Sequence, residues 1–357
     1  MAKMRAVMKM DPLPGADLVE ADVPELGPRD LLLKVKAAAI CGTDIHINEW
    51  TDYAQARVKP PMIFGHEYCG EVVAVGDQVR QASVGDLVAA ETHIPCERCP
   101  QCMTGNMHVC ERMRIIGVHT DGAFADYALL PEPCAWVLPP DSDPELGAVL
   151  EPMGVGVHGV LVDRVDARSV AVFGCGPIGL FAVGTALAAG ASQVFALEVT
   201  PYRLEMARRL FPEAIVLNPL EQDVEGIVRE RTGGKGVDVS VELSGSPMAT
   251  RQCFQILRKG GRVSLVGLGG DVTLNPTADI IYREAKVYGV TGRVMWETWY
   301  QMMDIINSGR FDPRQVITHR FPLEEYAQAL ALAKSGQAGK ILLLPSVVNT
   351  EIRKAQR

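Results

Sequence analysis

The second half of the chain alternates short apolar runs with longer amphipathic stretches. The apolar runs are rich in β-branched residues and are closed by Gly or Ser, as in "GVDVSVELSG", "GGRVSLVGLGG" and "AKVYGVTG". Helical patterns such as "PMATRQCFQILRKG" lie between them. Buried strands that alternate with helices form a parallel sheet with helices on both faces. The pattern therefore predicts an α/β domain with a doubly wound parallel sheet over residues 148–291.

Residues 1–147 follow a different pattern, in which short strands alternate with Pro/Gly turns. Examples are "DLLLKVKAAAI", "YCGEVVAVGDQV" and "VGDLVAA", and they predict a mainly β domain. After Gly292 two amphipathic helical stretches, "ETWYQMMDIINSG" and "LEEYAQALALAKSG", precede the strand-like "KILLLP". We assign residues 292–357 to the first domain, so that this domain is built from both ends of the chain.

The stretch "VAVFGCGPIGLFAVGTALAAGA" carries no charge over about the length of a membrane span. Its glycines, the proline directly after a G-x-G and the β-branched apolar start are nevertheless typical of a buried strand, a tight turn and a buried helix. The following "SQVFALE" predicts a second strand that ends at Glu198. Together these segments predict one βαβ unit.

The turn of this unit has the spacing of a dinucleotide-binding loop. Gly174 allows the tight turn, Gly176 lets the backbone approach a pyrophosphate, and Gly179 lets helix and strand pack closely. Pro177 and Ile178 open the helix, whose N-terminus offers N–H donors to an anion. The alternative is an ordinary α/β packing turn without a ligand.

A carboxylate at the end of the second strand favours NAD over NADP. Glu198 can accept hydrogen bonds from the adenosine ribose hydroxyls and would repel a 2′-phosphate. Arg203 could partly offset that repulsion, or it could pair with Glu205 or solvent on the helix surface. Gly267 and Leu268, which follow the strand in "GGRVSLVGLGG", complete the expected cofactor-binding set.

Composition narrows the class of partner. The chain has 357 residues, of which 48% are hydrophobic and 22% are charged, which is typical of a globular protein of two domains. A net charge of -8 argues against a duplex nucleic-acid or anionic membrane surface and favours a small-molecule partner. The N-terminal "MAKMRAVMKMDPLPG" lacks the apolar core of a secretory signal, so we expect a cytoplasmic location.

Four of the nine cysteines lie in the short segment "CERCPQCMTGNMHVC". In a reducing compartment such a cluster indicates metal ligands more readily than disulfides. Four thiolates fill the tetrahedral shell of zinc, so this site would be closed and chemistry would have to occur elsewhere. The expected ligands are Cys96, Cys99, Cys102 and Cys110.

A second set of metal-ligand types occurs in "ICGTDIHINEW" and "FGHEYCGEV". Cys41, His66 and Glu67 offer a thiolate, an imidazole and a carboxylate, which are the donors of three-ligand catalytic zinc sites. Adjacent residues on a regular strand face apart, so His66 and Glu67 could reach one ion only from a turn, and Gly65 offers one. The alternatives are a buried apolar cysteine, a loop histidine and a solvated carboxylate.

The motifs "CGTDIHINEW", "GHEYCGEVVAVG", the cysteine segment, "GCGPIG", "ITHRF" and "SGQAGKILL" resemble the zinc-dependent medium-chain dehydrogenase family over nearly the whole chain. Within that family the chain is most similar to the L-threonine 3-dehydrogenase branch, on "CGTDIHI", His93 and "ETWY". The resemblance implies a GroES-like catalytic domain, a Rossmann NAD domain and a structural zinc lobe over residues 93–113. It also implies a catalytic zinc on Cys41, His66 and Glu67, and a homotetramer.

The resemblance further implies oxidation of a secondary alcohol, with L-threonine giving 2-amino-3-oxobutanoate. Thr43 would pass the hydroxyl proton toward His46, which releases it to solvent, unless His46 only caps or packs its helix. Glu151 would be an exchangeable zinc ligand or a partner for bound water, and His93 would belong to the same site.

The sequence departs from the threonine pattern directly after Glu151. The segment "MGVGVHGV" replaces a Phe-Gly-Asn-Ala stretch, so that Val155 stands where an asparagine is expected, and this version is similar to the polyol dehydrogenase branch. A threonine ammonium could pair with Glu151 and its carboxylate with Arg293. The alternatives are a polyol or sugar-alcohol dehydrogenase and a non-catalytic NAD-binding sensor, and retention of every metal-ligand position counts against the sensor.

Overall fold

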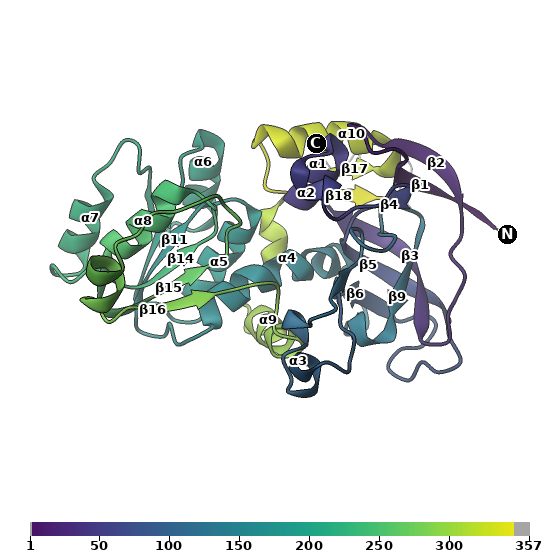
Figure 1. The fold of residues 1–357 in the computed structure, drawn as a ribbon, viewed down its shortest axis with the longest axis horizontal. Coiled ribbons are helices and arrows are strands. Elements are labelled where there is room, and N and C mark those ends of the chain that lie inside the picture. The colour runs from purple at the N-terminus through teal and green to yellow at the C-terminus, as the bar shows by residue number, and fades with distance from the viewer. Residues whose placement is uncertain (1, 346–357) are drawn as a thin grey trace. The chain divides into compact units, whose positions relative to one another are not determined.

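A computed structural model describes residues 2–345 of the chain. The chain divides into two compact units, one formed by Met1–Glu151 with Ile317–Arg357 and the other by Pro152–Val316. Both ends of the chain therefore contribute to the first unit, and the segment that forms the second unit lies between them in the sequence, as the colours of Figure 1 show. Among the helices of residues 2–345, none combines the length and apolar character needed to cross a bilayer.

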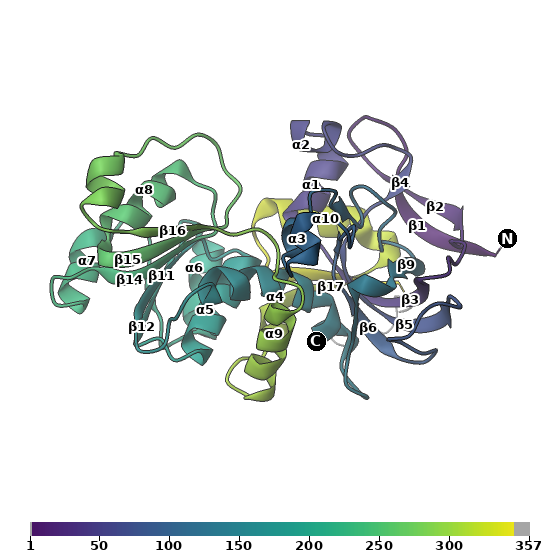
Figure 2. The same cartoon turned by 60° about the horizontal axis from the view of Figure 1, so that its bottom comes forward.

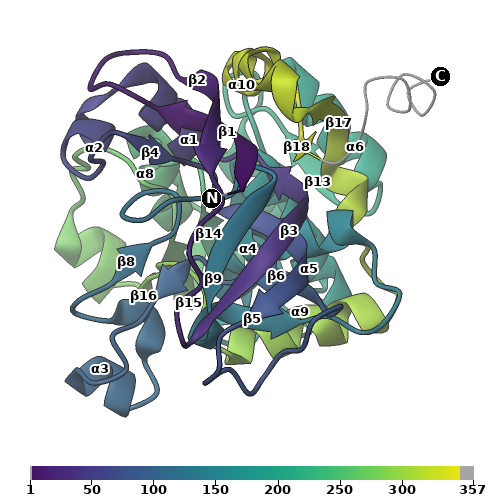
Figure 3. The ribbon, with the colours of Figure 1, turned by 90° about the vertical axis from the view of Figure 1, so that its right-hand side faces the viewer.

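The first unit is built mainly from β-strands. Its seven-stranded sheet has the order β10-β6-β5-β3-β18-β17, with β9 also paired to β3. Buried and partly exposed positions alternate along the first part of β3, as expected for a strand with one face on a core. Strands β3 and β9 lie in the foreground of Figure 3. The strands of this sheet are β3 (Asp30–Ala39), β5 (Glu67–Val75), β6 (Leu87–Ala90), β9 (Tyr127–Pro131), β10 (Ala135–Val137), β17 (Ile317–Pro322) and β18 (Lys340–Leu344).

Smaller elements complete the first unit. A three-stranded sheet contains β1 (Lys3–Lys9), β2 (Asp17–Asp22) and β4 (Met62–Ile63), and a two-stranded one contains β7 (His93–Ile94) and β8 (Arg114–Ile115). The helices are α1 (Gly42–Glu49), α2 (Asp52–Gln55), α3 (Pro100–Met103) and α10 (Tyr326–Ser335), with short 3₁₀ turns η1 (Met107–Val109), η2 (Glu132–Cys134) and η5 (Leu323–Glu325). The mainly β character predicted for this region is confirmed.

The second unit is the doubly wound sheet that the sequence predicted. Its six strands are all parallel and have the order β13-β12-β11-β14-β15-β16. The chain moves outward from β11 in one direction and then returns to β14 and continues in the other. The switch point thus lies between β11 and β14, where α/β sheets bind ligands at the carboxyl ends of their strands. The strands are β11 (Ser169–Phe173), β12 (Gln193–Leu197), β13 (Ile215–Leu217), β14 (Val237–Glu242), β15 (Leu257–Leu265) and β16 (Lys286–Gly289).

Helices cover both faces of this sheet. Helix α5 packs on β11 and β12, α8 packs on β14 and β15, and the two lie on opposite faces (Figure 2). Most of α5 is buried, which explains the uncharged stretch in the sequence as a core helix rather than a membrane span. The helices are α4 (Pro144–Leu161), which crosses the boundary of the units, α5 (Pro177–Ala188), α6 (Pro201–Leu210), α7 (Val224–Arg231), α8 (Pro247–Gln255), α9 (Glu297–Asn307), the π-helix η3 (Pro276–Ile281) and the 3₁₀ turn η4 (Pro313–Val316).

The unit boundary after the sheet differs from the one expected from sequence. Residues 292–316 were assigned to the first domain, whereas the structure groups them with the second unit. The reason is a close packing contact, since a Cβ on Gly154 would lie 2.4 Å from Cγ of Arg293 and 3.2 Å from Sδ of Met302. Trp299 and Met302 of α9 are fully buried. The amphipathic helix was predicted correctly, but its apolar face packs within the second unit.

Candidate metal and cofactor sites

The four clustered cysteines converge as their spacing predicts. Their sulfur atoms lie within 4.8 Å of one another, and Sγ of Cys99 is 3.5 Å from Sγ of Cys102 and 3.9 Å from Sγ of Cys110. Zn–S bonds of about 2.3 Å in a tetrahedron place the sulfurs about 3.8 Å apart. The backbone N–H groups of Cys96 and Arg112 each donate to Cys110 Sγ at 3.3 Å. The arrangement fits a closed zinc site.

Hydrogen bonds within this lobe lower the thiol pKa at two of the four positions even without a cation. The backbone N–H of Arg98 donates to Cys96 and lowers the pKa of its thiol to about 6. A backbone hydrogen bond from Cys102 likewise lowers the pKa of Cys99, whereas burial raises that of Cys102 to about 12. A bound cation would favour the thiolate at all four positions.

Cys41, His66 and Glu67 form a second group, with ligand atoms within 4.8 Å of one another. Gly65 makes the turn that lets the two adjacent side chains reach one point, since its φ is +94° and a Cβ there would lie 2.3 Å from the Phe124 ring. Glu67 then begins β5. The structure therefore brings together the three donors that sequence spacing could only suggest.

The buried carboxylate of Asp44 lies beside His66, where it could accept a hydrogen bond from a metal-bound histidine. Oδ2 of Asp44 accepts from the backbone N–H of Cys41 at 2.8 Å, and Oδ1 lies 3.6 Å from Nδ1 of His66. Within residues 2–345 neither Oδ1 nor Nδ1 has a hydrogen-bond partner. Metal-ligating histidines present one ring nitrogen to the ion and the other to a carboxylate, which explains both unsatisfied atoms. The donor set and these two atoms fit zinc.

Neighbouring charged side chains shift the pKa values of His66 and Glu67. Burial lowers the pKa of His66, but the Asp44 carboxylate and Cys41 outweigh burial and hold it well above its ordinary value. Burial raises the pKa of Glu67, Lys340 opposes this, and Glu151 reinforces it. Glu151 itself is buried. Sequence reasoning missed Asp44 and Lys340; a lysine at the start of the apolar run "KILLL" was the available signal for the second.

The two expected relay residues both lie in α1. Thr43 is half-buried and His46 is exposed, and Nδ1 of His46 lies 3.1 Å from Oγ1 of Thr51. An exposed imidazole can exchange a proton with solvent, as the last member of a relay must. His93 in β7 has its Nδ1 2.9 Å from Oε1 of Glu91, a fully buried carboxylate that sequence reasoning also missed.

The glycine turn has the close contacts expected of a dinucleotide loop. Gly174 has a φ of +90°, and a Cβ on Gly179 would lie 1.7 Å from the carbonyl oxygen of Gly174. Gly176 caps α5, which Pro177 and Ile178 open. No larger residue fits at Gly179 without moving the backbone, so its absence of a side chain is a packing requirement.

Glu198 ties the end of β12 to this turn. Its Oε2 accepts from the backbone N–H of Cys175 at 2.8 Å, and its Oε1 accepts from Val199 and Thr200 at 2.8 and 2.9 Å. A Cβ at Gly176 would lie 3.8 Å from Nη1 of Arg203, so the guanidinium lies beside the turn. Nε of Arg203 is buried and has no hydrogen-bond partner in the described part of the chain.

Gly267 lies at the carboxyl end of β15, close to the end of β14. A Cβ there would lie 2.3 Å from the backbone nitrogen of Gly245 and 2.6 Å from Oε2 of Glu242. Glu242 is buried and accepts from the backbone N–H of Ser244 at 2.8 Å. Leu268 is 90% exposed. The residues expected to bind the cofactor thus follow the carboxyl ends of β11, β12 and β15.

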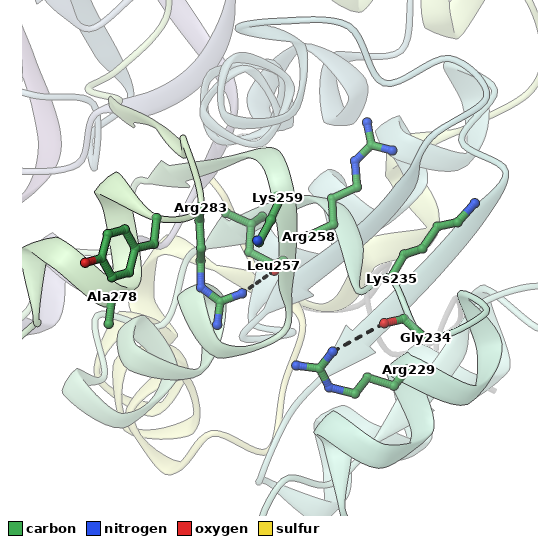
Figure 4. Close-up of a pocket in the computed structure, with 9 residues that line it drawn as sticks. Arg229, Gly234, Lys235, Leu257, Arg258, Lys259, Ala278 and Arg283 are labelled. Carbon is green, nitrogen blue, oxygen red and sulfur yellow. Dashed lines mark hydrogen bonds between the residues drawn. The ribbon is translucent and has the colours of Figure 1, made fainter.

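A cavity of about 580 Å³ lies at the opposite edge of the same sheet (Figure 4). Its lining comes from α7, η3 and the segments at the amino ends of β14, β15 and β16, the edge at which parallel sheets do not bind cofactors. Its arginines bond to the protein itself, since Arg283 donates to Leu257 O at 2.6 Å and Arg229 to Gly234 O at 3.4 Å. This cavity is therefore separate from the cofactor site. It is lined by Arg229, Gly234, Lys235, Leu257, Arg258, Lys259, Ala278, Tyr282 and Arg283.

Comparison with known proteins agrees with the fold. Residues 27–140 match the alcohol dehydrogenase GroES-like domain, and residues 177–308 match the zinc-binding dehydrogenase family. The L-threonine 3-dehydrogenase of Symbiobacterium thermophilum is 48% identical over 346 residues, covering 96% of this chain and 98% of that protein. That of Bacillus subtilis is 44% identical over 344 residues, covering 96% and 99%. The chain belongs to the zinc-dependent medium-chain dehydrogenase family.

Solved structures give the same result. A zinc-binding dehydrogenase from Sinorhizobium meliloti, bound to NADP, superposes with a TM-score of 0.87 at 31% identity, covering 97% of this chain and all of that one. The 2R,3R-butanediol dehydrogenase of Bacillus subtilis superposes with a TM-score of 0.86 at 29% identity, covering 96% and 100%. The protein is therefore a zinc-dependent alcohol dehydrogenase that uses a nicotinamide cofactor.

Proposed function

We propose that this enzyme oxidises L-threonine to 2-amino-3-oxobutanoate with NAD as the hydride acceptor. The main support is the combination of relatives at 43–48% identity over 96% of the chain with the Cys41, His66 and Glu67 cluster backed by Asp44. When bound there, zinc would supply a Lewis acid that makes the substrate hydroxyl more acidic. A second zinc, held by the four lobe cysteines, would have a structural role only.

The protein's own groups account for proton handling and orientation. Thr43 would accept the hydroxyl proton by hydrogen bonding and pass it toward His46, whose exposed ring returns it to solvent. Glu151 would offer a carboxylate to the substrate ammonium, since burying that charge unpaired is costly. The buried Glu91 carboxylate would fix the orientation of the His93 ring through its Nδ1.

The cofactor would bind at the carboxyl edge of the second unit's sheet. Gly176 would let a pyrophosphate approach the N-terminus of α5, with Gly174 making the tight turn and Gly179 the close helix–strand packing. Glu198 would accept hydrogen bonds from the adenosine ribose and thereby select NAD. Arg203, whose guanidinium lies beside Gly176, would contact the same end of the cofactor.

A polyol or sugar alcohol is the second candidate substrate. Val155 follows Glu151 where the threonine branch is expected to carry a polar residue, and the butanediol dehydrogenase superposes on the chain. Measuring NAD reduction at 340 nm with L-threonine beside a panel of polyols separates the two candidates. A higher kcat/KM for L-threonine supports the main proposal, and an inert threonine with an active polyol replaces it.

We further propose a homotetramer in the cytoplasm with two zinc ions per chain. The catalytic and cofactor domains would correspond to the two units, with boundaries after Glu151 and Val316. Elemental analysis gives the zinc count and light scattering gives the mass of the assembly. One zinc per chain would contradict the assignment of two metal sites, and an assembly smaller than a tetramer would contradict the homotetramer.

A further inference from the structure

The cavity shown in Figure 4 has a strongly cationic lining. The described residues that line it include three arginines and two lysines but no aspartate or glutamate, although the whole chain carries a net charge of -8. Cations that lie close together repel one another, so such a group lowers the stability of the fold unless another charge compensates it. The five side chains are those of Arg229, Lys235, Arg258, Lys259 and Arg283.

Close backbone contacts hold the segments of this lining together. The turn after α7 has Gly234 and Gly236 at positive φ, and a Cβ on Gly236 would lie 2.4 Å from the carbonyl oxygen of Ile256. This contact fixes the turn against the start of β15. Further along the same strand, the backbone N–H of Gly260 donates to the carbonyl oxygen of Arg283 at 2.7 Å. The cations are thus carried by backbone segments that are bound to one another without a ligand.

The arginines are also held by acceptors of the protein. Nη1 of Arg283 donates to a backbone carbonyl at the start of β15 at 2.6 Å, while its Nη2 makes no hydrogen bond within residues 2–345. Nε and Nη2 of Arg229 donate to Oε1 of Glu225 at 2.9 and 2.8 Å. Nη2 of Arg258 lies 2.9 Å from Oδ1 of Asp238. Since a guanidinium has five N–H donors, each of the three is oriented and still keeps donors for a ligand.

Three cations of the lining have no compensating carboxylate. Lys235 and Lys259 are exposed, and their ammonium groups form neither an ion pair nor a hydrogen bond in the described part of the chain. Arg283 bonds only to a neutral backbone acceptor. An anion in the cavity would meet these three charges, and little ordering would be needed because the arginines are already fixed. The arrangement therefore favours a ligand that carries several negative charges close together.

The side chains and the size of the cavity narrow the class of ligand. Arginine binds phosphate oxygens bidentately, and lysine binds them as a point charge. The volume of about 580 Å³ lies within the range of about 300–1,000 Å³ that is typical of pockets for whole small molecules. Tyr282, which is 71% exposed and also lines the cavity, offers an aromatic face beside the cations.

We propose that this cavity binds an oligophosphate group, carried either by a nucleotide or by an inorganic oligophosphate. The proposal concerns a site other than the glycine turn and depends neither on the substrate nor on the metals of the proposed function. Because the two sites lie at opposite edges of the sheet, the oligophosphate would bind without displacing the cofactor.

Isothermal titration calorimetry of the full-length, zinc-loaded enzyme with inorganic triphosphate, in about 0.15 M salt, tests the site. The double variant Lys235→Gln with Lys259→Gln should fold, because neither side chain bonds to the protein. The expected result is one triphosphate per wild-type chain and a dissociation constant raised at least tenfold in the double variant. Absence of saturable binding in the wild type, or an unchanged constant in the double variant, would overturn the proposal.

A matched control separates this site from a general effect of charge. Arg208→Gln with Arg209→Gln removes two positive charges from exposed positions on α6 and should leave the dissociation constant unchanged. An equal loss of affinity in both double variants would show that only net charge matters, and the proposal would be wrong. Heat from removal of zinc by the probe would be the same in every variant, so it cannot produce the expected difference between them.

Titration in the presence of saturating NADH places the ligand. The dissociation constant for triphosphate should be the same with and without NADH, whereas a constant that rises with the NADH concentration would assign the triphosphate to the glycine turn and refute the proposal. Light scattering covers the case in which a second copy of the chain fills the cavity. Triphosphate would then not bind, the Lys235→Gln and Lys259→Gln variant would change the mass of the assembly, and the proposal would fail.

A nucleoside triphosphate, titrated with NADH present, identifies the source of the phosphate. Affinity equal to that of inorganic triphosphate would support the proposal with the phosphates alone being recognised. Binding at least threefold tighter than that of inorganic triphosphate, with the gain lost in Tyr282→Ser, would support it with a nucleotide as the ligand, because an aromatic ring can stack on any base. Binding of the nucleotide that is equally strong in the lysine double variant would contradict both forms.

Discussion

Replacing Glu198 by Gln tests the cofactor site, because it exchanges one carboxylate oxygen for an NH₂ group. In the wild type the two carboxylate oxygens accept three backbone N–H groups, one from the glycine turn and two from the residues after β12. Glutamine has one oxygen and one NH₂ group. If the oxygen faces Val199 and Thr200, the NH₂ group faces the N–H of Cys175, and two donors oppose each other.

The magnitude follows from this count. Loss of one charge-assisted hydrogen bond costs about 1.5–3 kcal/mol, and the two that remain become neutral and weaken by roughly half. The relief of burying a charge offsets part of this loss. We expect Glu198→Gln to lower the free energy of unfolding of the second unit by about 2 kcal/mol. Removing the repulsion toward a 2′-phosphate should narrow the preference for NAD over NADP about tenfold, equivalent to 1.4 kcal/mol.

Two measurements are needed. Calorimetry gives the stability of the second unit, and the ratio of kcat/KM for NAD and NADP gives the selectivity. Glu205→Gln is the matched control, because it removes the same charge from an exposed position on α6. An unchanged NAD/NADP ratio in Glu198→Gln would show that another residue reads the ribose, and unchanged stability would refute the role of Glu198 in fixing the turn.

Three further predictions concern the turn, the sheet and the metals. Gly179→Ala should abolish cofactor binding in a fluorescence titration with NADH, because the added Cβ would lie 1.7 Å from Gly174 O. Asp238→Asn should lower stability by about 1–3 kcal/mol at pH 7, because Asp238 accepts from N and Oγ of Ser169 at 2.9 and 2.8 Å. Cys41→Ser should abolish turnover with little loss of fold, whereas Cys99→Ser should lower thermal stability.

Each of these predictions has a distinct contradicting result. Gly270→Ala is the control for the turn and should bind NADH normally, because apart from its two chain neighbours no residue of the described chain lies within 4 Å of the new Cβ. Burial raises the pKa of Asp238, but the hydrogen bonds from Ser169 outweigh it and the net pKa is lowered. Its stabilisation is therefore present above pH 4 and is lost as pH falls through the depressed folded value; a variant difference that grows in acid contradicts this. Exchanged phenotypes of the two cysteine variants would mean that the two metal sites are reversed.

The sequence was sufficient to predict those features whose residues lie close together in the chain. The glycine turn, the cysteine lobe and the alternating strands and helices are each specified by residues within a few positions of one another, and their spacing predicts the contacts observed. The grouping of Cys41 with His66 and Glu67 needed two separate segments, which the resemblance to a known family supplied.

The missed residues act through contacts that only the fold defines. Lys340 reaches Glu67 only because both strands pair with β3, and no local pattern states that register. Asp44 and Glu91 matter because each lies beside a histidine of a candidate site. The sequence shows that they are carboxylates but does not show which side chain each one contacts. The expected placement of residues 292–316 in the first domain differs from the division into units for a related reason, because amphipathicity shows that α9 has a buried face without showing which core receives it.

The insertion of the second unit between the two parts of the first has a consequence for synthesis on the ribosome. Chains fold from the N-terminus as they emerge, so Cys41, His66 and Glu67 leave the exit tunnel long before β18 is made. Until Lys340 arrives, some 270 residues later, the Glu67 carboxylate lacks its ion-pair partner and the strand β3 lacks one of its neighbours. The nascent second unit can complete its own parallel sheet during this interval. Release of an intact C-terminus is then the event that closes the first unit, and truncation before Lys340 should leave a folded second unit attached to an incomplete first one.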